Sequence, residues 1–155
     1  MSKSKEAREL FENGFSCAQS VLYTHGKTFF KDPGFALKLA SPYKAGISYR
    51  GEMCGAVSGS LMVIGLHYGY SDQSYDLSKE MTHRITHEFL ESFEKENGSL
   101  ICNRLLNAEI NTEEGLEYAR KNGLFDTICP RMVAGASEML EALIKKYPPE
   151  RTTGR

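Results

Sequence analysis

The sequence contains four cysteines, and thiol chemistry is the first function that it suggests. Cys17, Cys54, Cys102 and Cys129 lie far apart in the chain, and none has a second cysteine nearby. Thiolates bind metals, hold iron–sulfur clusters and attack disulfides. The charged start of the chain lacks the apolar segment of a secretory signal, so we expect a cytoplasmic protein. Structural disulfides are rare in that compartment, and the cysteines therefore need another explanation.

Each cysteine is expected in the first turn of a separate helix. Ser16 and Gln19 match the capping-box pattern around Cys17, and Cys129 is followed by a proline, which suits the first helical position. A helix start carries unpaired N–H groups and the positive end of the helix dipole, which favour a thiolate. We therefore expect the four sulfurs to meet at one redox site that uses them as catalytic groups or ligands.

The segment from Arg50 to Gly59 reads RGEMCGAVSG and places very small residues directly after a cysteine. Gly55 and Gly59 are four apart, so one side of the helix lacks bulk and allows a backbone or an inorganic cluster to approach. We assign both glycines to a cofactor-binding face. Cys54 is the expected most reactive sulfur because Arg50 and the helix start are near it. The same glycine spacing also occurs in plain helix packing, and a buried cysteine can serve as a small hydrophobe.

The elements that must position these residues are helices, because the sequence shows no sustained alternation of apolar and polar residues. We predict an all-α, single-domain helical bundle of about five to seven helices over residues 1–147 and a flexible C-terminal tail over residues 148–155. The expected helical segments are residues 4–12, 16–26, 54–68, 75–96, 99–106, 112–121 and 129–147, with a short helical piece at 35–40.

Charge and hydropathy exclude several classes of partner. Nineteen Lys and Arg balance twenty Asp and Glu without long charge runs, which argues against nucleic acid. The longest nearly apolar run, Ala56 to Leu66, is shorter than the roughly 20 residues of a membrane helix, so we expect no membrane insertion. His83 and His87 are expected to face solvent, and His25 and His67 to cap helix C-termini.

Four cysteine blocks resemble the C_GCAxxG_C_C family of four-cysteine redox proteins. The blocks are GFSCAQSVL, CGAVSGSLMVIGLHYG with the complete CGAxxG motif, FEKENGSLICNRLL and CPRMVAGASEML. Residues 42–45 depart from the glycine-richer loop that the resemblance leads us to expect before Gly46. The resemblance implies a cysteine-based redox role, as an oxidoreductase or electron carrier, and names no substrate.

Three functions remain open at this point. The first hypothesis is that Cys17, Cys54, Cys102 and Cys129 bind an iron–sulfur cluster or another metal for electron transfer. Structural zinc is disfavoured because its close cysteine pairs are missing. The second is a metal-free protein that cycles between dithiol and disulfide, and the third is a non-redox helical interaction module. A redox partner protein of unknown identity is expected, and a homo-oligomer is compatible with the sequence.

Overall fold

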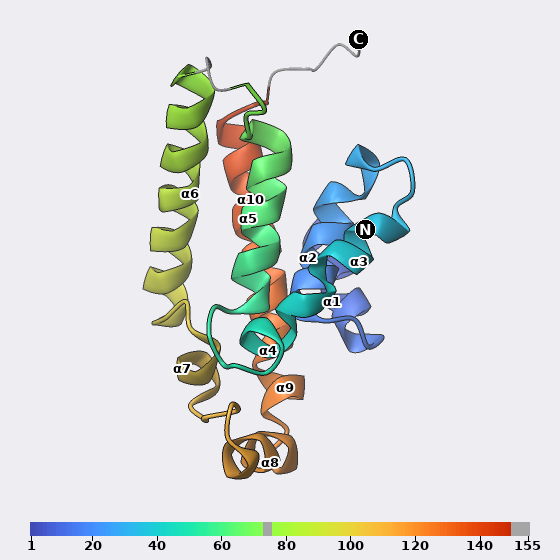
Figure 1. The fold of residues 1–155 in the computed structure, drawn as a ribbon, viewed down its shortest axis with the longest axis vertical. Coiled ribbons are helices and arrows are strands. Elements are labelled where there is room, and N and C mark those ends of the chain that lie inside the picture. The colour runs from blue at the N-terminus through green and yellow to red at the C-terminus, as the bar shows by residue number, and fades with distance from the viewer. Residues whose placement is uncertain (73–75, 150–155) are drawn as a thin grey trace.

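A computed structural model describes residues 1–72 and 76–149 of the chain, and these residues are largely helical (Figure 1). The helical elements are α1 (Lys3–Glu12), α2 (Cys17–Gly26), η1 (Lys27–Phe29), α3 (Gly34–Ala40), η2 (Ser41–Tyr43), α4 (Lys44–Ile47), α5 (Gly55–Tyr68), α6 (Asp76–Asn97), α7 (Cys102–Leu106), α8 (Glu113–Lys121), α9 (Leu124–Thr127) and α10 (Cys129–Lys146). Tyr75, the expected start of α6, and residues 150–155 of the expected tail lie outside the described residues.

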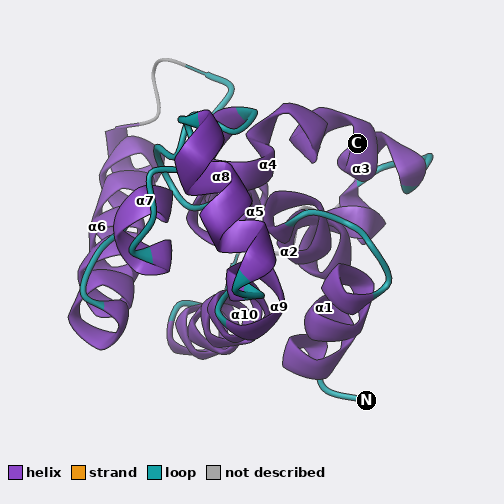
Figure 2. Cartoon of the chain, turned by 90° about the horizontal axis from the view of Figure 1, so that it is seen from below, coloured by secondary structure: helices purple, strands orange, loops and turns teal. Residues whose placement is uncertain are grey.

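The all-α prediction is confirmed, but the predicted number of helices is too low. Eight α-helices of five or more residues are present among the described residues, against the expected five to seven. Figure 2 shows helices and connecting loops only, and the one β-type contact in the described part is an isolated bridge between Met53 and Ile101. The count exceeds the prediction by one because the short helical piece expected at residues 35–40 is a full α-helix of seven residues, α3.

Local capping signals explain where the helices begin. The Ser16 hydroxyl accepts the Gln19 N–H, and the Gln19 side chain accepts the Ser16 N–H, so the capping box before α2 is complete. The Thr112 hydroxyl accepts the Gly115 N–H at the start of α8. Such caps satisfy backbone donors that the helix itself cannot, and they fix the starts of α2 and α8 at the predicted residues within one position.

The main core lies between two groups of helices. The long helices α5, α6 and α10 pack side by side, and α1 and α2 cover the other side of α5 and α10 (Figure 1). Phe89, Phe93, Leu22 and Leu140 are fully buried there. Each such side chain contributes about 1.5–3 kcal/mol through burial. No helix in residues 1–72 and 76–149 is long and apolar enough to span a membrane.

A second, smaller core lies under α7, α8 and α9, at one end of the long helices. Its buried members are Cys102, Leu106, Ile110, Ala119 and Cys129, whereas Cys54 belongs to the main core and the half-buried Cys17 packs against both. The cysteines therefore lie at the junction of the two cores. Two separately packed parts of the chain meet there, and this junction holds the site.

Candidate redox site

All four cysteines occupy helix starts, as the sequence predicts. Cys17, Cys102 and Cys129 are the first residues of α2, α7 and α10, and Cys54 is the N-cap residue of α5. The start of α7 differs from the expected position at Ser99, because the Ser99 hydroxyl accepts the Ile101 N–H just before the helix. Cys102 is thereby placed at the helix start itself.

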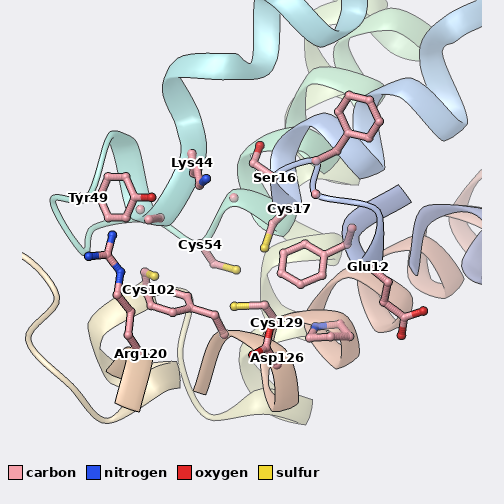
Figure 3. Close-up of a pocket in the computed structure, with 18 residues that line it drawn as sticks. Glu12, Ser16, Cys17, Lys44, Tyr49, Cys54, Cys102, Arg120, Asp126 and Cys129 are labelled. Atoms are coloured by element: carbon pink, nitrogen blue, oxygen red, sulfur yellow. The ribbon is translucent and has the colours of Figure 1, made fainter. Parts of the chain in front are cut away.

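The four side chains converge on one cavity of about 440 Å³. We call this space, which all four cysteines line, the sulfur cavity. In Figure 3 the sulfurs of Cys17, Cys54, Cys102 and Cys129 point toward one another from four different elements. Cys17 is half-buried and the other three are buried. The structure thus brings together all four residues that the sequence singled out.

A short backbone pairing joins the starts of α5 and α7. The Cys54 N–H donates to the Leu100 carbonyl at 2.8 Å, and the Cys102 N–H donates to the Glu52 carbonyl at 2.6 Å. The bridge between Met53 and Ile101 lies between these two hydrogen bonds. Because both cysteines belong to the paired segments, their relative position is fixed by backbone hydrogen bonds. The sequence offers no strand pattern that would reveal this pairing.

The small residues after Cys54 allow α5 to approach α2. A Cβ atom added to Gly59 would lie 2.8 Å from the Ala18 carbonyl oxygen, and one added to Gly55 would lie 3.1 Å from the Cβ of Cys17. The two glycines therefore bring Cys17 and Cys54 to the same cavity. Gly55 lines the sulfur cavity, whereas Gly59 packs against Ala18 one turn further along and is not among the lining residues.

The sulfurs of Cys17 and Cys129 face each other in the sulfur cavity (Figure 3). The Cys17 thiol donates to the Cys129 sulfur, which lowers the pKa of Cys129 against the opposing effects of burial and the Asp126 charge. The same hydrogen bond raises the pKa of Cys17 well above its usual value, and burial and the other three sulfurs raise it further. The pair therefore favours a thiolate on Cys129 and a protonated thiol on Cys17.

Burial opposes the expected activation of Cys54. Burial raises the pKa of Cys54 to about 11, although the Ala56 and Val57 N–H groups at the start of α5 act in the opposite direction. Burial, with added repulsion from Cys54 and Cys129, raises the pKa of Cys102 to about 12. Helix-start stabilisation of a charge is limited to about 2 kcal/mol, and desolvation exceeds it here.

The cations at the cavity are not those nearest to the cysteines in sequence. Arg50, the expected activator of Cys54, forms an ion pair with Glu52 instead, with a distance of 3.1 Å between Nη2 and Oε1. The cavity is lined by Lys44 and Arg120, with Tyr49 between them. No sequence motif points to these three residues, because only the folded chain places α8 beside residues 44–49.

The histidines lie outside the site. His83 and His87 are exposed, as predicted. His25 does not act as a charged helix cap: it is buried, its Nε2 lies 2.6 Å from the Ser137 hydroxyl, and burial lowers its pKa to about 3. Burial also lowers the pKa of His67, whose ring packs edge-on against Phe29. Neither His25 nor His67 carries the charge that a helix C-terminus would favour.

The four sulfurs suit a cluster better than a single metal ion. Within residues 1–72 and 76–149, no three His, Cys, Asp or Glu side chains are placed to hold one metal ion. A single ion therefore does not fit this arrangement of the sulfurs. An iron–sulfur cluster makes a different demand, because its four cysteines bind different iron atoms around a larger body. Four sulfurs around a cavity of about 440 Å³ provide donors and space of that kind.

Comparison with known proteins identifies the family. The model of a family described as "Putative redox-active protein (C_GCAxxG_C_C)" matches residues 15–143. The chain belongs to this family. All four cysteines of the sulfur cavity fall inside the matched range, so the resemblance seen in the sequence is confirmed. No curated protein and no solved structure matches the chain.

Proposed function

We propose that this protein is a thiol–disulfide redox protein in which Cys17 and Cys129 cycle between a dithiol and a disulfide. The observation that carries the proposal is that the Cys17 and Cys129 sulfurs face each other in the sulfur cavity, and their interaction lowers the pKa of Cys129. A thiolate is the species that attacks a disulfide, and a neighbouring thiol can then resolve the mixed disulfide. The redox description of the family agrees with this assignment.

The roles follow from the environments of the two sulfurs. Cys129 is the expected nucleophile, because its pKa is the one that the site lowers. Cys17 is the expected resolving thiol, because it is protonated in the resting state and is hydrogen-bonded to Cys129. Cys54 and Cys102 stay protonated at neutral pH, since burial raises both of their pKa values. They are expected to remain thiols while the pair is oxidised.

Binding of an iron–sulfur cluster is a second candidate function. It is favoured by the convergence of all four sulfurs on one cavity, which a two-cysteine mechanism does not require. When bound, such a cluster would supply one-electron transfer. Cys17, Cys54, Cys102 and Cys129 would be its ligands, and the three protonated thiols among them would have to release their protons on binding.

Anaerobic purification followed by iron analysis and thiol titration separates these functions. The dithiol proposal predicts colourless protein that loses two of its four thiols on mild oxidation. Cys17→Ser and Cys129→Ser should each abolish that loss, whereas Cys54→Ser and Cys102→Ser, the matched controls, should retain it. Coloured protein with stoichiometric iron that depends on all four cysteines would favour the cluster. Unchanged redox behaviour in all four variants would favour a non-redox interaction module.

A further inference from the structure

The backbone next to the sulfur cavity is strained. Five consecutive residues, Ala45 to Tyr49, have positive φ angles between 46° and 69°, and only one of them is glycine. A left-handed conformation costs about 1–2 kcal/mol for each residue with a side chain, and runs of such residues are rare. Strained backbone of this kind is found where the surrounding structure holds it, often at functional sites.

We call residues 45–49 the left-handed turn, and hydrogen bonds attach it to the site. The Tyr49 N–H donates to the Lys44 carbonyl at 3.2 Å, and the Glu52 N–H donates to the Gly46 carbonyl at 3.0 Å. A Cβ atom on Gly46 would lie 2.8 Å from the Cβ of Cys102, so the turn lies directly against a cysteine of the cavity. The conformation therefore positions Lys44 and Tyr49 relative to the sulfurs.

Two cationic side chains, Lys44 and Arg120, flank the ring of Tyr49 at the end of this turn. The Lys44 Nζ lies 5.8 Å from the centroid of the Tyr49 ring, and the Arg120 guanidinium lies 6.0 Å from it. Lys44, Tyr49 and Arg120, which we call the cationic rim, all line the sulfur cavity and lie at one side of it in Figure 3. Neither Lys44 nor Arg120 forms an ion pair with any described residue.

The two carboxylates of the cavity lie away from this rim. Glu12 forms an ion pair with Arg8 on the same helix, with 2.8 Å between Nε and Oε1. Asp126 lies near Cys129, and its charge acts on the pKa of that thiol. The cavity thus has a positive side at the rim and a negative group near the nucleophile. An anionic group on a ligand would be held at the rim and repelled from Asp126, which directs the rest of the ligand toward Cys129.

From this arrangement we infer that the substrate of the Cys17–Cys129 pair is a small anionic disulfide, whose acidic group binds between Lys44 and Arg120. The inference rests on the proposed dithiol function and adds the substrate class. Phe11, Phe15 and Phe125 also line the cavity, so a ligand with an apolar body fits behind the charged end. An ion bound only at the rim would leave this apolar part of the cavity empty.

The reaction is a two-electron exchange in two steps. The Cys129 thiolate attacks one sulfur of the substrate, forms a mixed disulfide and releases the other half of the substrate as a thiolate. Cys17 loses its proton to that thiolate and attacks the Cys129 sulfur, which forms the Cys17–Cys129 disulfide and releases the second half as a thiolate. The substrate gains two electrons and the Cys17 proton, and the protein loses them. A dithiol reductant then reduces the Cys17–Cys129 disulfide, is itself oxidised to a disulfide, and restores the pair.

The test compares small disulfides of different charge. Dithiobis(2-nitrobenzoate) is dianionic, dithiodipyridine is neutral and cystamine is dicationic. Rates of loss of the free Cys129 thiol, as mixed or intramolecular disulfide, are measured by peptide mass spectrometry for the unaltered chain, for Lys44→Gln, for Arg120→Gln and for the double variant. Lys121→Gln is the matched control, because Lys121 is the exposed neighbour of Arg120 on α8 and does not line the cavity.

The expected result is a charge-selective loss of rate. Each rim substitution should slow the dianionic reagent about threefold at low ionic strength, and the double variant should slow it about tenfold. The neutral reagent should change less than twofold, cystamine should react faster with the double variant, and Lys121→Gln should behave as the unaltered chain. Equal losses for the anionic and neutral reagents, no loss, or an equal loss in Lys121→Gln would overturn the inference.

The neutral reagent separates the inference from the function on which it rests. If dithiodipyridine produces the Cys17–Cys129 disulfide but the rim variants show no charge selectivity, the substrate class is wrong and the dithiol function stands. If no reagent produces that disulfide, the dithiol function is wrong and the substrate inference fails with it.

Discussion

Replacing Cys17 by alanine should make Cys129 a weaker acid. The substitution removes the thiol that donates to the Cys129 sulfur, the largest influence on the pKa of that residue, while burial and the Asp126 charge remain. Hydrogen bonds to charged groups contribute about 1.5–3 kcal/mol, and an S–H group is a weak donor, so we take the lower end. The pKa of Cys129 should then rise, and a loss of about 1.5 kcal/mol would shift its thiol–thiolate equilibrium about tenfold toward the thiol.

The assay follows alkylation of Cys129 by iodoacetamide as a function of pH, with each cysteine resolved by peptide mass spectrometry. Cys17→Ser is the conservative variant, because its hydroxyl can still donate, and it should recover most of the rate. Cys102→Ala is the matched control, since Cys102 lines the same cavity but stays protonated while Cys129 titrates, because its own pKa is raised to about 12. An unchanged Cys129 profile in Cys17→Ala, or an equal change in Cys102→Ala, would refute the hydrogen-bonded pair.

Three further predictions concern stability, all measured by chemical denaturation. Gly59→Ala should lower the free energy of unfolding by about 1–3 kcal/mol, because its Cβ would lie 2.8 Å from the Ala18 oxygen. Gly65→Ala, in the same helix with nothing within 4 Å, should raise it by about 0.5–1 kcal/mol, and equal effects would contradict the packing. His25 has a pKa of about 3 when folded and about 6.5 when unfolded, so the unfolded chain binds its proton more readily and stability falls as the pH drops below 6.5. Between pH 7 and pH 5 the loss should be about 2 kcal/mol, and it should be absent in His25→Gln. Ala45→Gly should raise the free energy of unfolding by about 1 kcal/mol because its φ is 54°; a loss would show that the turn is not strained.

Local signals in the sequence were sufficient to predict the helix starts and hence the cysteine positions. The capping box of Ser16 and Gln19 and the proline after Cys129 act over a few residues, so they can be read without knowledge of the fold. The spacing of Gly55 and Gly59 likewise indicates a close approach. The sequence could not identify the approaching partner, which is the backbone of α2 at Ala18.

The electrostatics of the site depend on long-range packing and were not predictable from local sequence. Arg50 is close to Cys54 in sequence but pairs with Glu52, whereas Arg120 reaches the cavity from α8. The expected activation of Cys54 reverses because burial outweighs the helix start. Burial at the junction of two cores and a contact between α2 and α10 are properties of the assembled chain.

No local sequence signal predicts the left-handed turn over residues 45–49. Positive φ angles are unfavourable for Ala45, Ile47 and Tyr49, so their local sequence would not predict a left-handed conformation. Their conformation is imposed by hydrogen bonds that involve Lys44 and by packing of Gly46 on Cys102. This is a case in which tertiary structure overrides the preferences of individual residues.

Disulfide mapping after oxidation tests the central claim most directly. The reduced protein is treated with one equivalent of dithiodipyridine, its remaining thiols are alkylated, and the linked peptides are identified by mass spectrometry. The account predicts a single intramolecular bond between Cys17 and Cys129, with Cys54 and Cys102 recovered as alkylated thiols. A bond between Cys54 and Cys102, a random mixture of pairings, or four unaltered thiols would contradict it.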